Sequence, residues 1–233
     1  MAEKKKVERQ FVEASTGKSS SRPAVVSAAN KSSATTKRIL AAILWVVALG
    51  AEICGILILN GTWFFPEETR LYWLIGAVVV DLILVVIGAQ LWKKANRLDP
   101  ASEANKVKFF FWNQMGLVAA VICFLPLIIL LLSNKEMDKK SKRIVTIVAA
   151  IALVIAALLS IDFNPVSAED LAEAQQTATG TVYWTRFGKS YHLDPDCHTL
   201  LNSSTVYSGT IEEAFEANRT DPCDFCALVE AAE

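Results

Sequence analysis

The C-terminal third of the sequence has few basic residues. Residues 162–233 contain three Lys or Arg against thirteen Asp or Glu, a net charge of −10, whereas residues 1–161 contain twenty basic and eleven acidic residues, a net charge of +9. A segment this acidic repels a phosphate backbone. We therefore exclude nucleic acid as its partner.

Cysteine is also scarce, and no Cys lies in the connections between the long apolar runs of the chain. A membrane thiol-disulfide oxidoreductase passes electrons between thiols, so the absence of Cys there counts against that class. The sequence has neither an inverted repeat nor a pair of interrupted apolar segments, which are typical of secondary transporters. Cys54 and Cys123 stand within apolar runs, where we interpret them as small apolar residues.

Apolar residues are abundant: 53% of the chain is hydrophobic and the mean hydropathy is +0.35. A bilayer core of about 30 Å requires roughly 20 helical residues, and lipid leaves no water for unpaired backbone groups. The sequence therefore predicts four transmembrane helices within residues 39–161. Their ranges are 39–59, 71–92, 109–132 and 144–161.

Aromatic residues lie near the ends of these runs, as expected for an interfacial belt. They are Trp63, Phe64, Phe65, Tyr72, Trp73, Trp92 and the residues of 109–112. The first run begins too late and is too long for a cleaved signal peptide, so we interpret it as an uncleaved anchor. Residues 1–38 carry a net charge of +6 without a sustained apolar period, and we expect them to be disordered.

Basic residues in the N-terminal tail and in residues 93–108 favour a cytoplasmic N-terminus. The connection 133–143 is also basic and would lie on the opposite side of four full spans. Alternatively, residues 109–132 dip into the membrane and return, which would place the C-terminal segment outside. We prefer four spans and a cytoplasmic C-terminal segment, because thiols stay reduced there.

Two carboxyl side chains interrupt the apolar runs. Glu52 and Asp81 would lie about 21 and 18 Å from the same surface if both helices are straight, so they can meet near the middle of the membrane. A proton or cation pathway is one interpretation. The other is that each carboxyl hydrogen-bonds a neighbouring helix and helps the bundle to assemble.

After the apolar runs, residues 162–180 predict an acidic helical linker in which Ser167 and Asp170 form a capping box. Residues 181–233 predict a small α+β module. The segments TVYWT and KSYHL alternate like strands around Gly188 and predict a hairpin, with a third strand at 205–207. Thr210 and Glu213 predict the start of a further helix.

This module holds the residues that specify a chemistry. Four residues separate His192 from Cys197, and twenty-five more lead to a CxxC formed by Cys223 and Cys226. Two short-spaced pairs of nitrogen and sulfur ligands are typical of a closed, structural Zn²⁺ site. His198 is the competing imidazole, but it directly follows Cys197, and adjacent side chains diverge. A disulfide within the CxxC is the alternative to metal.

At these residues the chain resembles a known family. The runs VYWT, GKSYHLDPDC, GTIEEAFEA and DPCDFC are similar to a small zinc-binding module at the ends of many bacterial proteins, and to the metal-binding domain of the Ada DNA-repair methyltransferase. The resemblance covers residues 181–226 and implies zinc at the same four positions. The Ada domain uses four thiolates, whereas His192 stands at the first position here, which implies a less nucleophilic site.

The sequence thus predicts a membrane α-helical protein of four transmembrane helices with a C-terminal α+β module. We expect a non-enzymatic protein of the bacterial plasma membrane, in contact with the lipid bilayer and with an unidentified protein partner. In this interpretation a structural Zn²⁺ ion stabilises a module used for protein interaction or regulation. The alternatives are a thiol-disulfide oxidoreductase that uses the CxxC and an ion or proton transporter that uses Glu52 and Asp81.

Overall fold

The computed structural model describes residues 10–13, 26–63, 65–135 and 137–227. The chain forms two compact units. The first is a helical bundle of residues 32–96 and 105–165, and the second combines residues 97–104 and 166–233 with the N-terminal residues 1–31, each as far as described.

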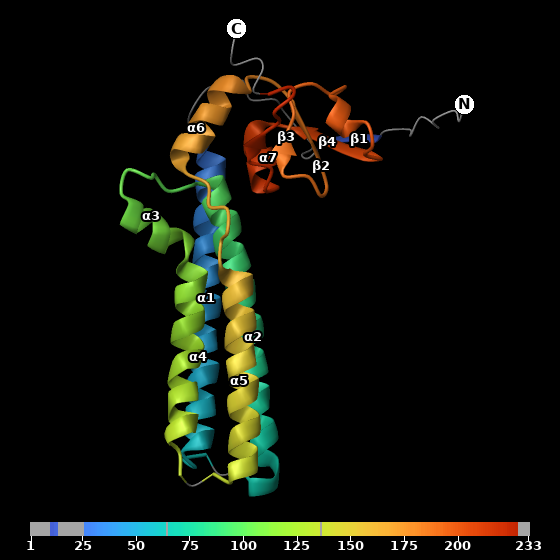
Figure 1. Cartoon of the computed structure of the whole chain (residues 1–233). Helices are drawn as coiled ribbons and strands as arrows, with labels where there is room; N and C mark the ends of the chain where they lie inside the picture. The colour runs from blue at the N-terminus through green and yellow to red at the C-terminus, as the bar shows by residue number, and fades with distance from the viewer. Residues whose placement is uncertain (1–9, 14–25, 64, 136, 228–233) are drawn as a thin grey trace, which may run out of the picture. The chain divides into compact units, whose positions relative to one another are not determined.

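Four long helices form the bundle, side by side and alternating in direction (Figure 1). They are α1 (Ala28–Leu59), α2 (Glu67–Leu98), α4 (Met115–Ser133) and α5 (Lys139–Ser160). Each is long and apolar enough to cross a membrane, so the prediction of four such helices is confirmed. Helix α4 is continuous from Met115 to Ser133.

The prediction that residues 1–38 are disordered is wrong for two stretches. Residues 28–38 form the first turns of α1, because the Ser27 hydroxyl accepts a hydrogen bond from the Asn30 N–H and caps the helix. Strand β1 (Gln10–Glu13) pairs with a strand of the C-terminal unit. The rest of the predicted tail before Val26 lies outside the described residues, as does Phe64 of the aromatic belt.

The third apolar run is divided. Helix α3 (Lys106–Asn113) ends before Gln114 and projects away from the bundle, and α4 begins at Met115 (Figure 1). The Gln114 side chain explains the break, because its amide donates to the Asp162 carbonyl (2.9 Å) and accepts from the Asp162 N–H (3.2 Å). The predicted span 109–132 is therefore corrected to 115–133.

Basic side chains of neighbouring helices satisfy the carbonyls at three helix ends. Arg70 donates to the carbonyls of Ile58 and Leu59 at the end of α1. Lys142 donates to the carbonyls of Leu132 and Asn134 at the end of α4. Lys93 donates to the carbonyls of Leu159 and Ile161 at the end of α5. Basic residues that the sequence suggested as topology signals thus also cap helices.

In the C-terminal unit, β2 (Val182–Thr185) pairs antiparallel with β4 (Thr205–Gly209), and β1 pairs parallel with the other side of β4. Strands β3 (Ser190–Tyr191) and β5 (Asp221–Pro222) form a second, parallel pair. Tyr183 and His192 exchange two backbone hydrogen bonds of 2.8 Å, which confirms the predicted hairpin. The capping box of Thr210 and Glu213 starts α7 (Ile211–Glu216) as predicted.

Helix α6 (Ala168–Thr177) starts at the predicted capping box of Ser167 and Asp170. It is not a free linker, because Leu171, Ala174 and Ala178 pack into the core of the C-terminal unit. The module therefore begins near Val166 rather than at residue 181. The loop before α3 joins the same unit, since Glu169 on α6 accepts hydrogen bonds from Ser102 (2.5 Å) and the Glu103 N–H (3.0 Å).

Candidate metal centre

Two short turns supply the first pair of predicted ligands. His192 directly follows β3, and its backbone hydrogen bonds to Tyr183 fix where its side chain leaves the sheet. Cys197 precedes the 3₁₀ turn η1 (His198–Leu200), and its N–H donates to the Asp194 carbonyl. The Asp194 side chain accepts from the Asp196 N–H (2.9 Å), which stabilises the turn between the two ligands.

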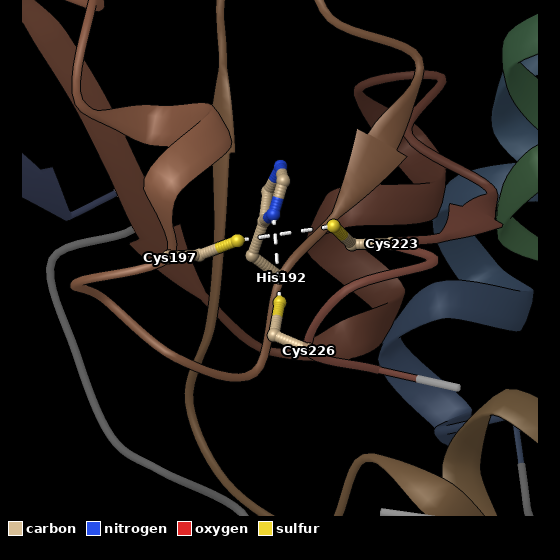
Figure 2. A group of neighbouring side chains, drawn as sticks. All are labelled: His192, Cys197, Cys223 and Cys226. Atoms are coloured by element: carbon tan, nitrogen blue, oxygen red, sulfur yellow. Dashed lines mark hydrogen bonds between the residues drawn. The ribbon is translucent and has the colours of Figure 1, made fainter. Parts of the chain in front are cut away.

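The CxxC supplies the second pair. Cys223 follows β5, and its N–H donates to the Tyr191 carbonyl (3.0 Å), so the strand pair carries His192 and Cys223 next to each other. The Cys226 N–H donates to the Cys223 carbonyl (3.4 Å), which closes the turn between the two thiols. The four predicted ligand side chains therefore converge from the segments that follow β3 and β5 (Figure 2).

The distances fit one tetrahedral ion. The four ligand atoms all lie within 4.8 Å of one another. The Cys197 and Cys223 sulfurs are 3.9 Å apart, and the His192 Nδ1 lies 3.6 Å from the Cys226 sulfur (Figure 2). Zn–S bonds of about 2.3 Å and Zn–N bonds of about 2.0 Å give tetrahedral edges of about 3.8 and 3.5 Å. The four side chains can thus hold a metal ion.

A disulfide does not describe this arrangement. Cys223 and Cys226 are both free cysteines, as is Cys197. The alternative of a disulfide within the CxxC is therefore absent from the structure.

Thr199 is a member of the site that the sequence did not suggest. Its hydroxyl lies 3.1 Å from the Cys197 sulfur, 3.4 Å from the His192 Nδ1 and 3.8 Å from the Cys223 sulfur. A hydroxyl at this position can orient ligands and stabilise negative charge on sulfur. One residue separates Thr199 from Cys197, and this spacing matches no recognisable ligand motif. Only the folded turn η1 shows that the Thr199 hydroxyl belongs to the site.

Burial tunes the ligands toward metal binding. It lowers the pKa of His192, which keeps the imidazole in the neutral form that a metal requires. Burial raises the pKa of Cys226 to about 12, so this thiol becomes a thiolate only beside a positive charge such as a metal ion. Burial also opposes ionisation of Cys197, but hydrogen bonds from Thr199, Cys226 and Cys223 together outweigh it and leave the pKa of Cys197 below its ordinary value.

His198 does not join the ligands. Its ring packs edge-on against Phe225, with the ring centroids 4.4 Å apart, and its side chain is exposed. The preference for His192 as the fourth ligand therefore agrees with the geometry.

The two carboxyl groups of the bundle lie in its interior. Glu52 on α1 accepts a hydrogen bond from the Leu127 N–H of α4 (3.2 Å). Asp81 on α2 is 3% exposed, and its Oδ1 has no hydrogen-bond partner among the described residues. Cys123 is also buried, whereas Cys54 is half-buried.

Polar residues beside the break in the third run connect three helices. Asn113 accepts a hydrogen bond from Asn96 (3.1 Å), which in turn accepts one from Arg38 (3.3 Å). Trp92 differs from the predicted belt. Its ring is buried between those of Trp45 and Trp112, at 5.5 and 5.1 Å. These contacts join α1, α2 and α3 at one end of the bundle.

Comparisons of the chain with protein-family models, with curated proteins and with solved structures find no match, so the assignment of this centre depends on its residues and their geometry.

Proposed function

We propose that the chain is a non-enzymatic integral membrane protein that presents a zinc-stabilised module for binding another protein. The observation that carries the proposal is the convergence of three thiols and one imidazole within 4.8 Å in a unit with a small core. A unit of this size is only marginally stable without a cross-link, and a bound metal ion supplies such a cross-link.

The distribution of side chains on the bundle supports membrane insertion. Large apolar residues cover its outward faces, whereas its interior contains alanines and the buried carboxyls of Glu52 and Asp81. In water this pattern would be unstable, and in lipid it is the expected one. The exposed apolar residues include Val46, Ile53, Ile83, Ile129, Leu132, Val154 and Leu158.

The donor set supports zinc as the metal and a structural role for it. Thiolate and imidazole ligands suit Zn²⁺, and four protein ligands leave no open position for a water or a substrate. The ion therefore holds the fold rather than performing a reaction. This closed ligand set also favours metal over the redox function of a CxxC pair.

Exposed aromatic residues on the module support a protein partner. Phe187, at the tip of the hairpin, is 90% exposed, and Phe225, within the CxxC, is 61% exposed. They belong to a segment with a net charge of −10. Aromatic side chains and complementary charge are the usual anchors of protein interfaces, so a partner with a basic surface fits this module.

For the orientation we propose that both termini face the cytoplasm, in the bacterial plasma membrane that the resemblance of the module implies. Four spans keep both ends on one side, and basic residues at the start of α1, in the last turns of α2 and at the start of α3 favour the cytoplasm for that side. Reporter fusions after Glu233 test this orientation. Activity of a periplasm-specific reporter at that site would contradict it.

The metal assay uses the full-length protein in detergent. We expect one zinc per chain by elemental analysis, released stoichiometrically by a mercurial thiol reagent, and loss of this zinc in Cys223→Ser. The matched control is Cys54→Ser, a half-buried cysteine of the bundle that should retain zinc. A metal-free protein with a disulfide that forms and reduces reversibly would instead support the oxidoreductase.

A further inference from the structure

The apolar stretches of the four long helices contain no Lys, Arg or His. Within residues 39–59, 71–92, 115–133 and 144–160, the titratable side chains are Glu52, Cys54, Tyr72, Asp81 and Cys123, and α5 contributes none. The two buried carboxyl groups therefore have no basic side chain to neutralise them. Burying two unneutralised carboxylates in an apolar bundle is strongly unfavourable, so at least one of them must bind a proton or share a cation with the other.

The two carboxyl groups have different surroundings. The Glu52 carboxyl faces α4 next to Pro126, where the Leu127 N–H donates to its Oε1 at 3.2 Å. A hydrogen bond from a backbone N–H stabilises the ionised form of a carboxyl group. Glu52 is thus equipped to carry the negative charge of the pair.

Asp81 has no such donor. Its side chain is 3% exposed, and its Oδ1 is buried without a hydrogen-bond partner in the described parts of the chain. Asp81 lies close enough to Glu52 for the charge of the glutamate to act on it, and both carboxyls act on the buried Cys123 thiol. An unpartnered oxygen in this position makes Asp81 the group that must be neutral.

A metal ion is a poor candidate for the neutralising cation. Among the described residues, only the His192, Cys197, Cys223 and Cys226 group brings three or more such ligand atoms close enough for one ion. Glu52, Asp81 and Cys123 do not meet that condition. A proton needs a single carboxyl oxygen and no coordination shell, so it requires fewer ligands than a metal ion at this position.

We propose that Asp81 is a proton-binding site in the interior of the helix bundle, with Glu52 as its anionic partner, and that the proton exchanges with water. This activity is separate from the metal-stabilised module. It gives the bundle a role in proton binding beyond that of an anchor.

The test uses dicyclohexylcarbodiimide, an apolar reagent that adds to protonated carboxyl groups within membranes. The full-length protein in detergent is treated across a pH series, and the modified residue is identified by peptide mass spectrometry. We expect the label on Asp81, falling about tenfold per pH unit once the carboxyl ionises. Glu103, an exposed carboxyl outside the bundle, should stay unlabelled at neutral pH and serves as the internal control.

Two variants and one salt comparison complete the test. Asp81→Asn should abolish the label, and Glu52→Gln should reduce the label at neutral pH, because Asp81 then ionises without a negative neighbour. A label on Glu52 instead of Asp81 would overturn the assignment, as would an unlabelled or pH-independent Asp81 in the wild-type protein. Protection by sodium chloride, but not by choline chloride, would show that a metal cation occupies the site and would also overturn it.

Discussion

Two histidines six residues apart have opposite roles, and the backbone decides which one reaches the sulfurs. The two hydrogen bonds of His192 with Tyr183 hold its ring over the CxxC, whereas the His198 ring turns to Phe225. The Thr199 hydroxyl then contacts both members of the first ligand pair. A metal centre of this kind depends on single side chains more than on overall composition.

We therefore predict a graded effect of three substitutions on zinc affinity. His198→Ala should leave the affinity unchanged, because its ring lies outside the ligand set. Thr199→Val should weaken binding about 10- to 100-fold, as loss of an outer-shell partner does, and His192→Ala should weaken it further. Competition with a chromophoric zinc chelator measures the affinity of all three variants. Loss of zinc in His198→Ala but not in His192→Ala would mean that His198 is the ligand.

Among the helices, α1 and α2 are in close contact where an indole lies against a glycine. The Trp45 Nε1 donates to the Val85 carbonyl (3.3 Å), and a Cβ at Gly88 would lie 2.5 Å from that same nitrogen. Another glycine of α2, Gly76, has open space around its missing Cβ. The two positions form a matched pair within one helix.

Gly88→Ala should destabilise the bundle by about 1–3 kcal/mol, because the methyl group displaces the Trp45 ring from its hydrogen bond. Gly76→Ala should be neutral or stabilise by up to about 1 kcal/mol, since alanine favours the helix and meets no neighbour. Unfolding in mixed micelles, followed by circular dichroism, gives both values. Equal effects of the two substitutions would contradict this helix contact.

At the scale of the whole molecule, the two units obtain their stability from different sources. The bundle has two apolar core clusters with alanines between its helices, whereas the C-terminal unit builds a small core that includes the ligand residues Cys197 and Cys223. Trp184 is buried in that second core and stacks on Tyr207. Metal loss should therefore affect one unit and spare the other.

Removal of zinc by a strong chelator should unfold the C-terminal unit and leave the bundle helical, because metal binding contributes about 10 kcal/mol or more in small zinc domains. We expect the near-ultraviolet signal of Trp184 to change while most far-ultraviolet helical signal remains. Added zinc should restore the first signal. Cooperative loss of both signals would show that the bundle also depends on the metal.

Patterns local in the chain were sufficient for much of this structure. The lengths of the apolar runs predicted four long helices, and the spacing of His192, Cys197, Cys223 and Cys226 predicted the residues that converge. Capping boxes at Ser167 and Thr210 set two helix starts, because the hydrogen bonds involved span three residues. Interactions between residues so close in the chain can be recognised from the sequence itself.

Contacts between distant segments decided the rest. Gln114 ends one helix by bonding Asp162, 48 residues away, and α6 joins the module only because its apolar face finds the second core. The Thr199 hydroxyl becomes part of the candidate metal centre only after the two ligand pairs meet. Each of these depends on which surfaces the folded chain brings together, and neither hydropathy nor short-range spacing carries that information.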